Sequence, residues 1–209
     1  AAVEQALAAR ERSGQPVRLL AHSMGGLVAR TMQLECPQVW DRMMAHAGAR
    51  LLMLGTPNGG SWAPMQCLSG DDSFGNTLVA FRAMMARFPG FLQLQAGLVN
   101  DPRGLDKEAT WKALAEDDLK RVREHNWWHA DERQLSTFEW GVPPQGVLDQ
   151  AVALRKRLDA QRDTTLAKYK GKLALVVGHA KFTPDGYELG GEGLVYLNTP
   201  ESGDGRVPL

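Results

Sequence analysis

The segment VRLLAHSMGGLVAR, residues 17–30, decides how this chain folds. It begins with a short apolar run that predicts a buried strand, and it ends in residues that predict the first turns of a helix. Between them, residues 21–25 match the G-x-S-x-G pattern of a nucleophile elbow, with alanine at the first small position. Such an elbow is a very tight strand-to-helix turn that needs strained backbone angles at Ser23 and small residues two positions to either side. Ala21 and Gly25 are small enough, and the next glycine relieves crowding further.

This turn would give Ser23 a particular chemistry. Its hydroxyl would lie at a helix N-terminus, whose partial positive charge favours a developing negative charge. The backbone N–H of Met24 would point to where the oxyanion of an acyl-transfer intermediate lies. The alternatives are a serine in an ordinary glycine-rich turn and a phosphate-binding loop, but neither glycine pattern of a phosphate-binding loop occurs here.

Composition places the chain among ordinary globular proteins. It has 209 residues, 44% hydrophobic and 23% charged, with 24 acidic and 24 basic side chains. The length predicts one domain with a decorated core, and the balanced charge gives no indication of a nucleic-acid partner. No apolar run approaches the roughly 20 residues of a membrane span. Cys36 and Cys67 lack metal-ligand spacing and predict free thiols, so we expect no metal and no cofactor.

Further periodicities predict an α/β fold. Residues 1–13 have helical spacing, and Gly14 is a natural stop signal. Residues 49–54 and 172–177 predict two more buried parallel strands, which makes a strand–helix–strand unit with the first. We expect the three apolar runs to be adjacent parallel strands, with the helices at 1–13 and 26–35 covering the faces of the sheet.

A loop with the sequence GTPNGGS, residues 55–61, follows the second strand. Because it comes at the C-terminal end of a parallel strand, we expect it on the same rim as Ser23, where ligands bind in open α/β sheets. Thr56, Pro57 and Asn58 are therefore candidates for a substrate-pocket wall. The alternative is an ordinary turn rich in glycine, proline and asparagine.

The region 62–144 predicts several helices with irregular joints, and it holds five of the six tryptophans. One apolar stripe lies at 78–88. Inward apolar surface of this kind suits a helical cap over an active site, including a cap that contacts lipid, although plain helix packing produces the same pattern. We expect Trp127 and Trp128 to lie over or beside the rim that bears the nucleophile.

The C-terminal third returns to the sheet. Residues 145–170 predict one long amphipathic helix whose arginines lie on a solvated face. Residues 183–197 predict a turn-linked hairpin. The resulting organisation is a core with the elbow at 1–61, a helical cap at 62–144, and a return to the core at 145–209.

A serine nucleophile needs a base, and the base needs an orienting carboxylate. In an elbow-containing α/β fold these residues come in the order serine, acid, histidine. Asp204 follows the third strand and its hairpin and lies between two glycines that allow a tight loop. Asp185 is the alternative, and spacing alone leaves both open.

Three segments together resemble the lecithin:cholesterol acyltransferase family of α/β-hydrolases: AHSMGGLV at 21–28, LGTPNGGS at 54–61 and GDGRVP at 203–208. The segment VGH at 177–179 and the Thr-Pro pair that follows it also resemble that family's approach to its acid loop. The likeness runs through the chain in order, with the cap region similar only in character.

The resemblance implies an acyl-ester hydrolase or acyltransferase with a lid, with Ser23 as nucleophile and Asp204 as triad acid. Ala21 replaces the family's usual first glycine, which a small residue can do. Arg206 stands where the family usually has threonine, so the substrate is not carried over.

None of the histidines comes where the base is expected. The resembling family places its base after the acid, and only three residues follow Asp204. His179 precedes the acid, and the other four lie earlier still: His22, His46, His125 and His129. Because the chain begins with Ala1 rather than Met, we expect it to be a piece of a longer polypeptide, with the triad histidine beyond Leu209 and the second oxyanion donor before Ala1. The 209 residues alone should then not hydrolyse esters.

The sequence therefore predicts the central piece of an α/β-hydrolase-fold esterase, lipase or acyltransferase that acts on carboxylic, lipid-type esters through an acyl-enzyme. A thioesterase or amidase of the same fold remains open. The alternative from another class is a non-catalytic module that holds an apolar ligand or partner under its cap. The expected partners are an ester or lipid substrate and the rest of the same polypeptide.

Overall fold

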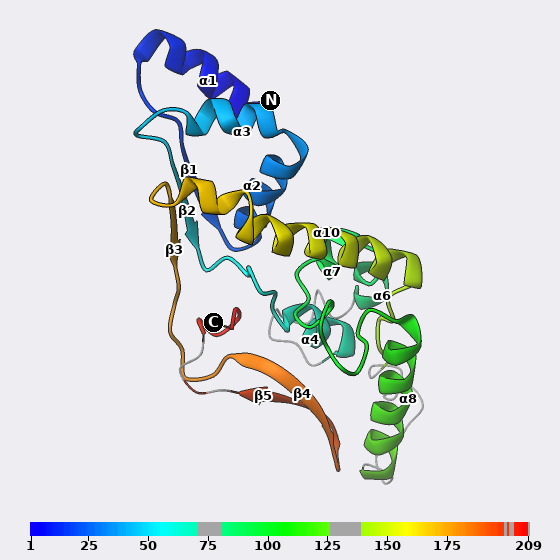
Figure 1. Cartoon of the computed structure of the whole chain (residues 1–209). Coiled ribbons are helices and arrows are strands. Elements are labelled where there is room, and N and C mark those ends of the chain that lie inside the picture. Colours follow the sequence, from blue (N-terminus) through cyan, green and yellow to red (C-terminus); the bar gives the residue numbers. More distant parts are fainter. Residues whose placement is uncertain (71–80, 126–138, 199, 201–202, 209) are drawn as a thin grey trace. The chain divides into compact units, whose positions relative to one another are not determined.

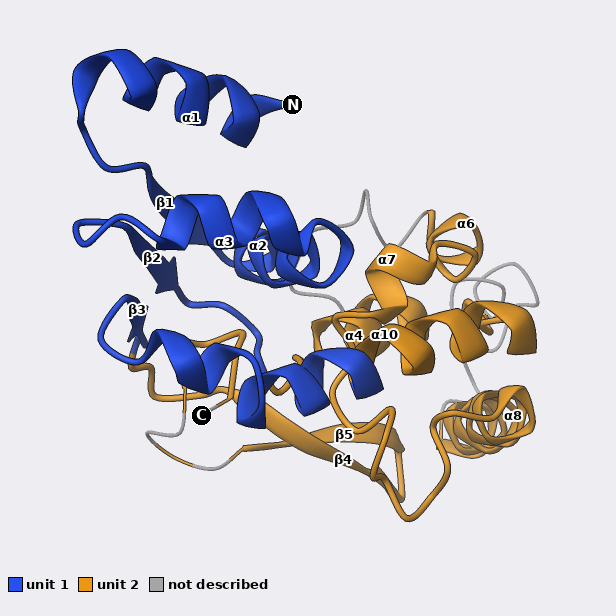
Figure 2. Cartoon of the chain, turned by 45° about the horizontal axis from the view of Figure 1, so that its top comes forward, with its two compact units in different colours: residues 1–58, 156–178 blue, residues 59–155, 179–209 orange. Residues whose placement is uncertain are grey.

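The structure, a computed structural model, describes residues 1–70, 81–125, 139–198, 200 and 203–208. The chain divides into two compact units: residues 1–58 with 156–178, and residues 59–155 with 179–209 (Figure 2). The first unit holds a parallel sheet with flanking helices. The second holds helices and an antiparallel hairpin.

A three-stranded parallel sheet forms the centre of the first unit (Figure 1). Its strands are β1 (Arg18–His22), β2 (Arg50–Leu54) and β3 (Leu173–Val176). β2 is the middle strand, with Ala21 of β1 opposite Met53 and Val176 of β3 opposite Leu54. The prediction that the three apolar runs are adjacent and parallel is confirmed, and the sheet with its helices is a partial α/β fold. Because parallel strands end at one edge, the segments that follow them start on one rim.

Three helices precede or connect the first two strands. α1 (Ala2–Ser13) ends at Gly14, whose φ of 68° is left-handed and whose N–H donates to the Arg10 carbonyl at 2.8 Å. α2 (Met24–Glu35) follows β1 directly, and α3 (Pro37–Met44) begins with proline, whose missing N–H has no helical partner there anyway. α2 lies against β1 and β2, whereas α1 lies against α3. The core of this unit includes Leu7, Trp40, Met43, Met44, Leu51 and Met53.

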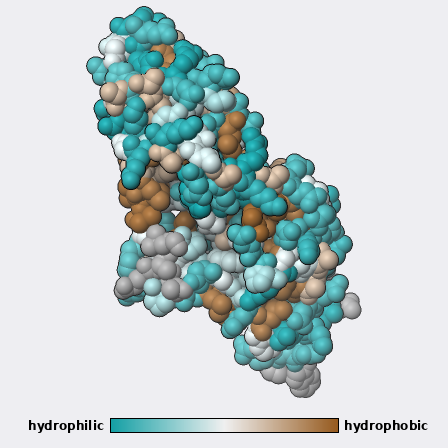
Figure 3. All heavy atoms as spheres, viewed as in Figure 1, coloured by the Kyte–Doolittle hydropathy of each residue, from teal (hydrophilic) through white to brown (hydrophobic). Residues whose placement is uncertain are grey.

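The outer strands of the sheet are less buried than the sequence predicts. In β2, Leu51 and Met53 are buried. In β1, however, Leu20 is 70% exposed, and in β3 Leu175 and Val176 are about half exposed. Figure 3 shows hydrophobic atoms at the surface of this part of the sheet. The prediction of buried strands is therefore wrong for β1 and β3, because within the described residues only β2 has a strand on each side.

The helix observed in the region 145–170 is shorter than predicted, and its charged face is less exposed to solvent than predicted. α10 (Gln145–Asp163) stops before two β-branched residues, and the Thr164 hydroxyl donates to the carbonyl four residues earlier at 2.7 Å, a bond that competes with helix continuation. The 3₁₀ helix η2 (Leu166–Tyr169) follows. Arg155, predicted on a solvated face, is only 4% exposed.

In its described residues, the second unit contains four helices, the first part of α10 and a hairpin. Its helices are α4 (Ala63–Ser69), α6 (Arg82–Met85), α7 (Pro89–Leu92) and α8 (Glu108–His125). The predicted hairpin is confirmed as the antiparallel pair β4 (Pro184–Gly190) and β5 (Gly193–Asn198). The core includes Trp62, Met65, Leu68, Leu92, Leu105, Trp111, Trp140, Leu148 and Tyr187. Among described residues, no helix is both long enough and apolar enough to cross a membrane.

The apolar stripe predicted at 78–88 is only partly core in its described residues, 81–88. Phe81, Met84 and Phe88 are each about half exposed, whereas Met85 packs against the core. Only the four residues of α6 are helical between 81 and 88. Helix α8 is instead fixed by a buried carboxylate. Asp118 accepts hydrogen bonds from the Trp140 indole at 2.8 Å and from the Leu194 backbone N–H at 2.6 Å.

Candidate functional site

Ser23 forms the tight turn between β1 and α2. Its φ is 51° and its ψ is −127°, and in the described part of the chain no other non-glycine residue has a positive φ. Such a conformation costs about 1–3 kcal/mol and persists only when the surroundings enforce it. The Ser23 N–H donates to the Leu54 carbonyl at 2.9 Å, which extends the β1–β2 ladder into the turn. The backbone strain that the elbow motif requires is thus present at the residue that the motif specifies.

The Ser23 side chain takes no part in holding the turn together. Serine in this position commonly caps the following helix, yet the Ser23 hydroxyl makes no such bond. The first N–H groups of α2, including that of Met24, have no carbonyl partner within the helix. A hydroxyl and an N–H group therefore adjoin the positive end of a twelve-residue helix.

The closest approach near the elbow involves Gly26 rather than Gly25. A Cβ added to Gly25 would meet the Ala21 Cβ at 3.8 Å, an ordinary contact, so there is no tight crowding across the turn. A Cβ added to Gly26 would lie 2.1 Å from the Thr56 hydroxyl oxygen. Gly26 therefore lets the loop after β2 approach α2 closely.

The predicted pocket residues of that loop lie in the first unit with the elbow. Thr56 is 4% exposed, and among the described residues its hydroxyl has no hydrogen-bond partner. Pro57 is buried, and Asn58 is partly buried. The Asn58 side-chain oxygen accepts a hydrogen bond from Arg30 of α2 at 2.9 Å. Thr56 and Asn58 thus both contact the helix that begins at the elbow.

Asp204 lies in the second unit, in a tight loop that its own side chain stabilises. Its Oδ1 accepts the N–H of Arg206 at 2.9 Å and that of Val207 at 2.8 Å. Gly205 between them has a φ of 96°, and its N–H donates to the Thr183 hydroxyl at 2.9 Å. Both of these bonds use Oδ1, and no described residue of the turn bonds Oδ2.

The structure thus brings part of the predicted site together. Ser23, Met24, Thr56, Pro57 and Asn58 share the first unit, and Asp204 belongs to the second. Trp127 and Trp128 lie outside the described residues. Asp185, the alternative acid, lies in β4. Of the histidines, His22 and His179 are exposed, and His125 pairs with Glu192 at 3.5 Å.

Two buried polar residues near the elbow were missed from sequence. Arg30 and Gln161 are both almost fully buried and hydrogen-bonded to each other at 3.2 Å. One signal was available, because Arg30 lies one helical turn after Gly26 and shares its face. No local pattern in the sequence connects Arg30 with Gln161, which lies 131 residues further along the chain.

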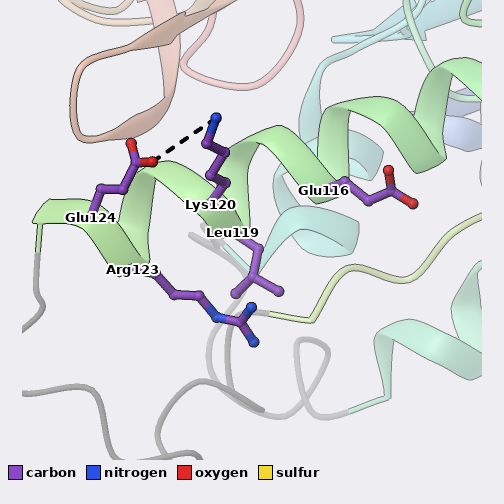
Figure 4. A pocket seen from close by; sticks show the side chains of 5 residues that line it. All are labelled: Glu116, Leu119, Lys120, Arg123 and Glu124. Carbon is purple, nitrogen blue, oxygen red and sulfur yellow. Dashed lines mark ion pairs between the residues drawn. The ribbon is translucent and has the colours of Figure 1, made fainter.

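Other candidates for a site are weaker. A surface hollow in the second unit is lined by five residues of one helix, α8, including the ion pair of Lys120 and Glu124 at 3.9 Å (Figure 4). Its described lining contains no serine, cysteine or histidine. Among the described residues, no three His, Cys, Asp or Glu side chains are grouped to hold a metal ion. Neither cysteine forms a disulfide with another described residue; Cys36 is exposed and Cys67 is buried.

Comparison with models of protein families and with curated proteins finds no match for this chain.

Proposed function

We propose that this chain is the nucleophile-bearing part of an α/β-hydrolase-fold enzyme that cleaves or transfers carboxylic esters, of the lipid type, through an acyl-enzyme on Ser23. The observation that carries the proposal is the backbone of Ser23. A non-glycine residue in a strained conformation, placed between a parallel strand and a helix, points to a functional demand on that residue.

The first chemical step would be attack of Ser23 Oγ on the ester carbonyl carbon. The hydroxyl proton passes to a histidine base, and the carbonyl oxygen becomes an oxyanion. The N–H of Met24 would donate to that oxyanion, supported by the positive end of α2. Collapse of the intermediate breaks the ester C–O bond, and the histidine returns the proton to the leaving alcohol.

The second step would release the acyl group. Water, or a second alcohol in a transferase, attacks the acyl-Ser23 carbonyl with the histidine again as base, and Ser23 recovers its proton. Asp204 would orient the histidine and stabilise its charged form. The availability of Oδ2 outside the turn supports this role for Asp204. The histidine is not assigned to a residue of this chain.

The loop after β2 would form one wall of the substrate pocket. Thr56, Pro57 and Asn58 follow the strand next to the elbow strand, and the contacts of Thr56 and Asn58 with α2 support this placement. The region 62–144, with Trp127 and Trp128, would be the cap. The aromatic-rich core of the second unit is consistent with a cap that is itself well packed.

The test is covalent labelling of the full-length protein with a fluorophosphonate, with the modified peptide identified by mass spectrometry. We expect one modified residue, Ser23, and hydrolysis of p-nitrophenyl esters that is lost in Ser23→Ala. The matched control is Ser13→Ala, at the exposed end of α1, which should label and hydrolyse like the parent.

The competing function is a non-catalytic module that holds an apolar ligand or partner. It predicts no labelling of Ser23 and no Ser23-dependent turnover. If the fluorophosphonate reacts elsewhere, or if turnover survives in Ser23→Ala, the proposed function is wrong.

A further inference from the structure

Arg30 is a buried guanidinium at the junction of three segments. It lies on α2, is 3% exposed, and donates hydrogen bonds from all three of its nitrogens. Nε bonds the side-chain oxygen of Gln161 at 3.2 Å, Nη1 bonds that of Asn58 at 2.9 Å, and Nη2 bonds the carbonyl of Leu158. One side chain therefore links the elbow helix to the loop after β2 and to the end of α10.

Gln161 completes the link to α10. Its Nε2 donates to the Arg30 carbonyl at 2.8 Å and to the Gln33 side-chain oxygen at 2.5 Å. Gln33 and Gln161 are both buried. Gln161 and Leu158 of α10 thus hold the Arg30 guanidinium through contacts that do not involve the loop.

Stability alone does not explain an arginine at this position. Removing a guanidinium from water costs several kcal/mol, and well-packed apolar residues commonly replace buried charges at no loss of stability. What a guanidinium adds is geometry, because its planar fork fixes several acceptors at once. The acceptor in the loop is Asn58, two residues after Thr56.

The loop after β2 is held against α2 at two points. Gly26 and Arg30 are four residues apart on α2, a rise of about 6 Å. The Asn58 N–H donates to the Thr56 carbonyl at 2.7 Å, so the segment between these two residues is a tight turn. Thr56 lies against Gly26 and Asn58 bonds Arg30, so both ends of this turn contact the helix.

We propose that Arg30 is a positioning residue that fixes loop 55–58 against the elbow helix and so sets the pocket wall beside Ser23. The part of this inference that concerns substrate rests on the proposed function, whereas the part that concerns the loop does not. Arg30 touches no reacting atom; it acts through Asn58.

The first test measures the loop itself, by hydrogen exchange of the backbone amides. In Arg30→Met, which keeps the volume and removes the donors, we expect exchange at residues 55–60 to rise at least tenfold, with α1 and β1 unchanged. Asn58→Ala should do the same while leaving the contacts of Arg30 with α10 in place, so the test survives if Arg30→Met fails to fold. The control is Arg157→Met. Arg157 lies on α10, as Gln161 does, and its exposed ion pair with Glu35 of α2 at 2.7 Å does not involve the loop.

The second test measures substrate binding in the full-length protein. Arg30→Met and Asn58→Ala should each raise KM for a p-nitrophenyl ester several-fold, with a smaller effect on kcat. The double variant should be no worse than either single variant, because both break one link. Arg30→Lys keeps the charge but not the fork, and should recover only part of the loss.

The outcomes separate the two proposals. Uniformly faster exchange across the first unit, or fully additive effects of the two substitutions on KM, would overturn the positioning role and leave Arg30 as a purely structural residue. If the parent protein neither labels at Ser23 nor hydrolyses esters, the proposed function fails, and the exchange experiment alone still decides whether Arg30 holds the loop.

Discussion

At the elbow, Ser23 itself takes the positive φ of 51°, and its side chain stays out of the turn. In the loop at 203–208, Gly205 takes the positive φ of 96°. The side chain of Asp204, the preceding residue, accepts hydrogen bonds from two backbone N–H groups of the same turn. The first turn is strained and unsupported by its own side chain, and the second is relaxed and supported by it. In the proposed mechanism the Ser23 hydroxyl must project clear of the backbone, whereas Asp204 can use one carboxylate oxygen in its loop and the other to orient the base.

The comparison implies that the elbow depends on packing from outside the turn. This packing is tightest at Gly26. We therefore expect Gly26→Ala to cause the largest loss in the free energy of unfolding. The added Cβ meets Thr56 at 2.1 Å, and overpacking of this kind costs about 1–3 kcal/mol in the free energy of unfolding. Urea unfolding followed by circular dichroism measures it.

Gly25→Ala is the matched control, because the added Cβ there has only an ordinary contact and alanine favours the helix by up to ~1 kcal/mol. Equal losses from the two substitutions would show that the crowding lies within the turn and not between helix and loop.

In the loop at 203–208 that holds Asp204, a substitution of Gly205 should lower stability for a different reason. A Cβ there has room, with its nearest neighbour at 3.6 Å, but the left-handed backbone disfavours any side chain. Gly205→Ala should therefore lower stability by about 1–2 kcal/mol. Gly191→Ala, with open space and no positive φ, should be close to neutral. If Gly205→Ala is neutral too, the loop adopts other backbone angles in solution.

Much of the first unit could be predicted from the sequence, because local patterns determine it. Apolar runs gave the three strands, and Gly14 and Pro37 mark helix ends. The strained turn at Ser23 follows from five consecutive residues. What could not be predicted is which groups meet across long separations. Arg30 and Gln161 are 131 residues apart, and no pattern in either segment indicates the other.

The second unit was harder to predict for the same reason. Its helix α8 is held by Asp118, which bonds Trp140 and Leu194 on separate segments. The turn-linked pattern at 183–197 identified the hairpin, but apolar periodicity also predicted a stripe at 78–88 in which Phe81 and Phe88 are about half exposed. A stripe becomes core only where a neighbour covers it, and that depends on the tertiary fold.

The support that Asp204 gives its own loop can be separated from its charge. Asp204→Ala removes the acceptor for two backbone N–H groups, and because the loop is partly exposed, water replaces some of the lost bonding. We expect a loss of about 1 kcal/mol in the free energy of unfolding. Asp204→Asn keeps Oδ1 as acceptor and should lose only a few tenths, although both variants should lack ester hydrolysis in the full-length protein. An asparagine variant as unstable as the alanine variant would show that the charge, not the acceptor, holds the loop.

Removing the side chain of Ser23 should increase stability. Ser23→Gly relieves the strain of a side chain at φ 51° and ψ −127°, which stores about 1–3 kcal/mol. Glycine also makes the unfolded chain more flexible, which offsets about 0.5–1 kcal/mol of that relief. The net result should be a free energy of unfolding that is higher by about 0–2.5 kcal/mol. Ser23→Ala keeps the Cβ and therefore the strain, so its stability should stay near that of the parent, while both variants lose fluorophosphonate labelling. Thermal and urea unfolding of the three proteins side by side would measure this difference. If Ser23→Gly is no more stable than Ser23→Ala, the elbow is not strained in solution, and the contrast with the relaxed acid loop disappears.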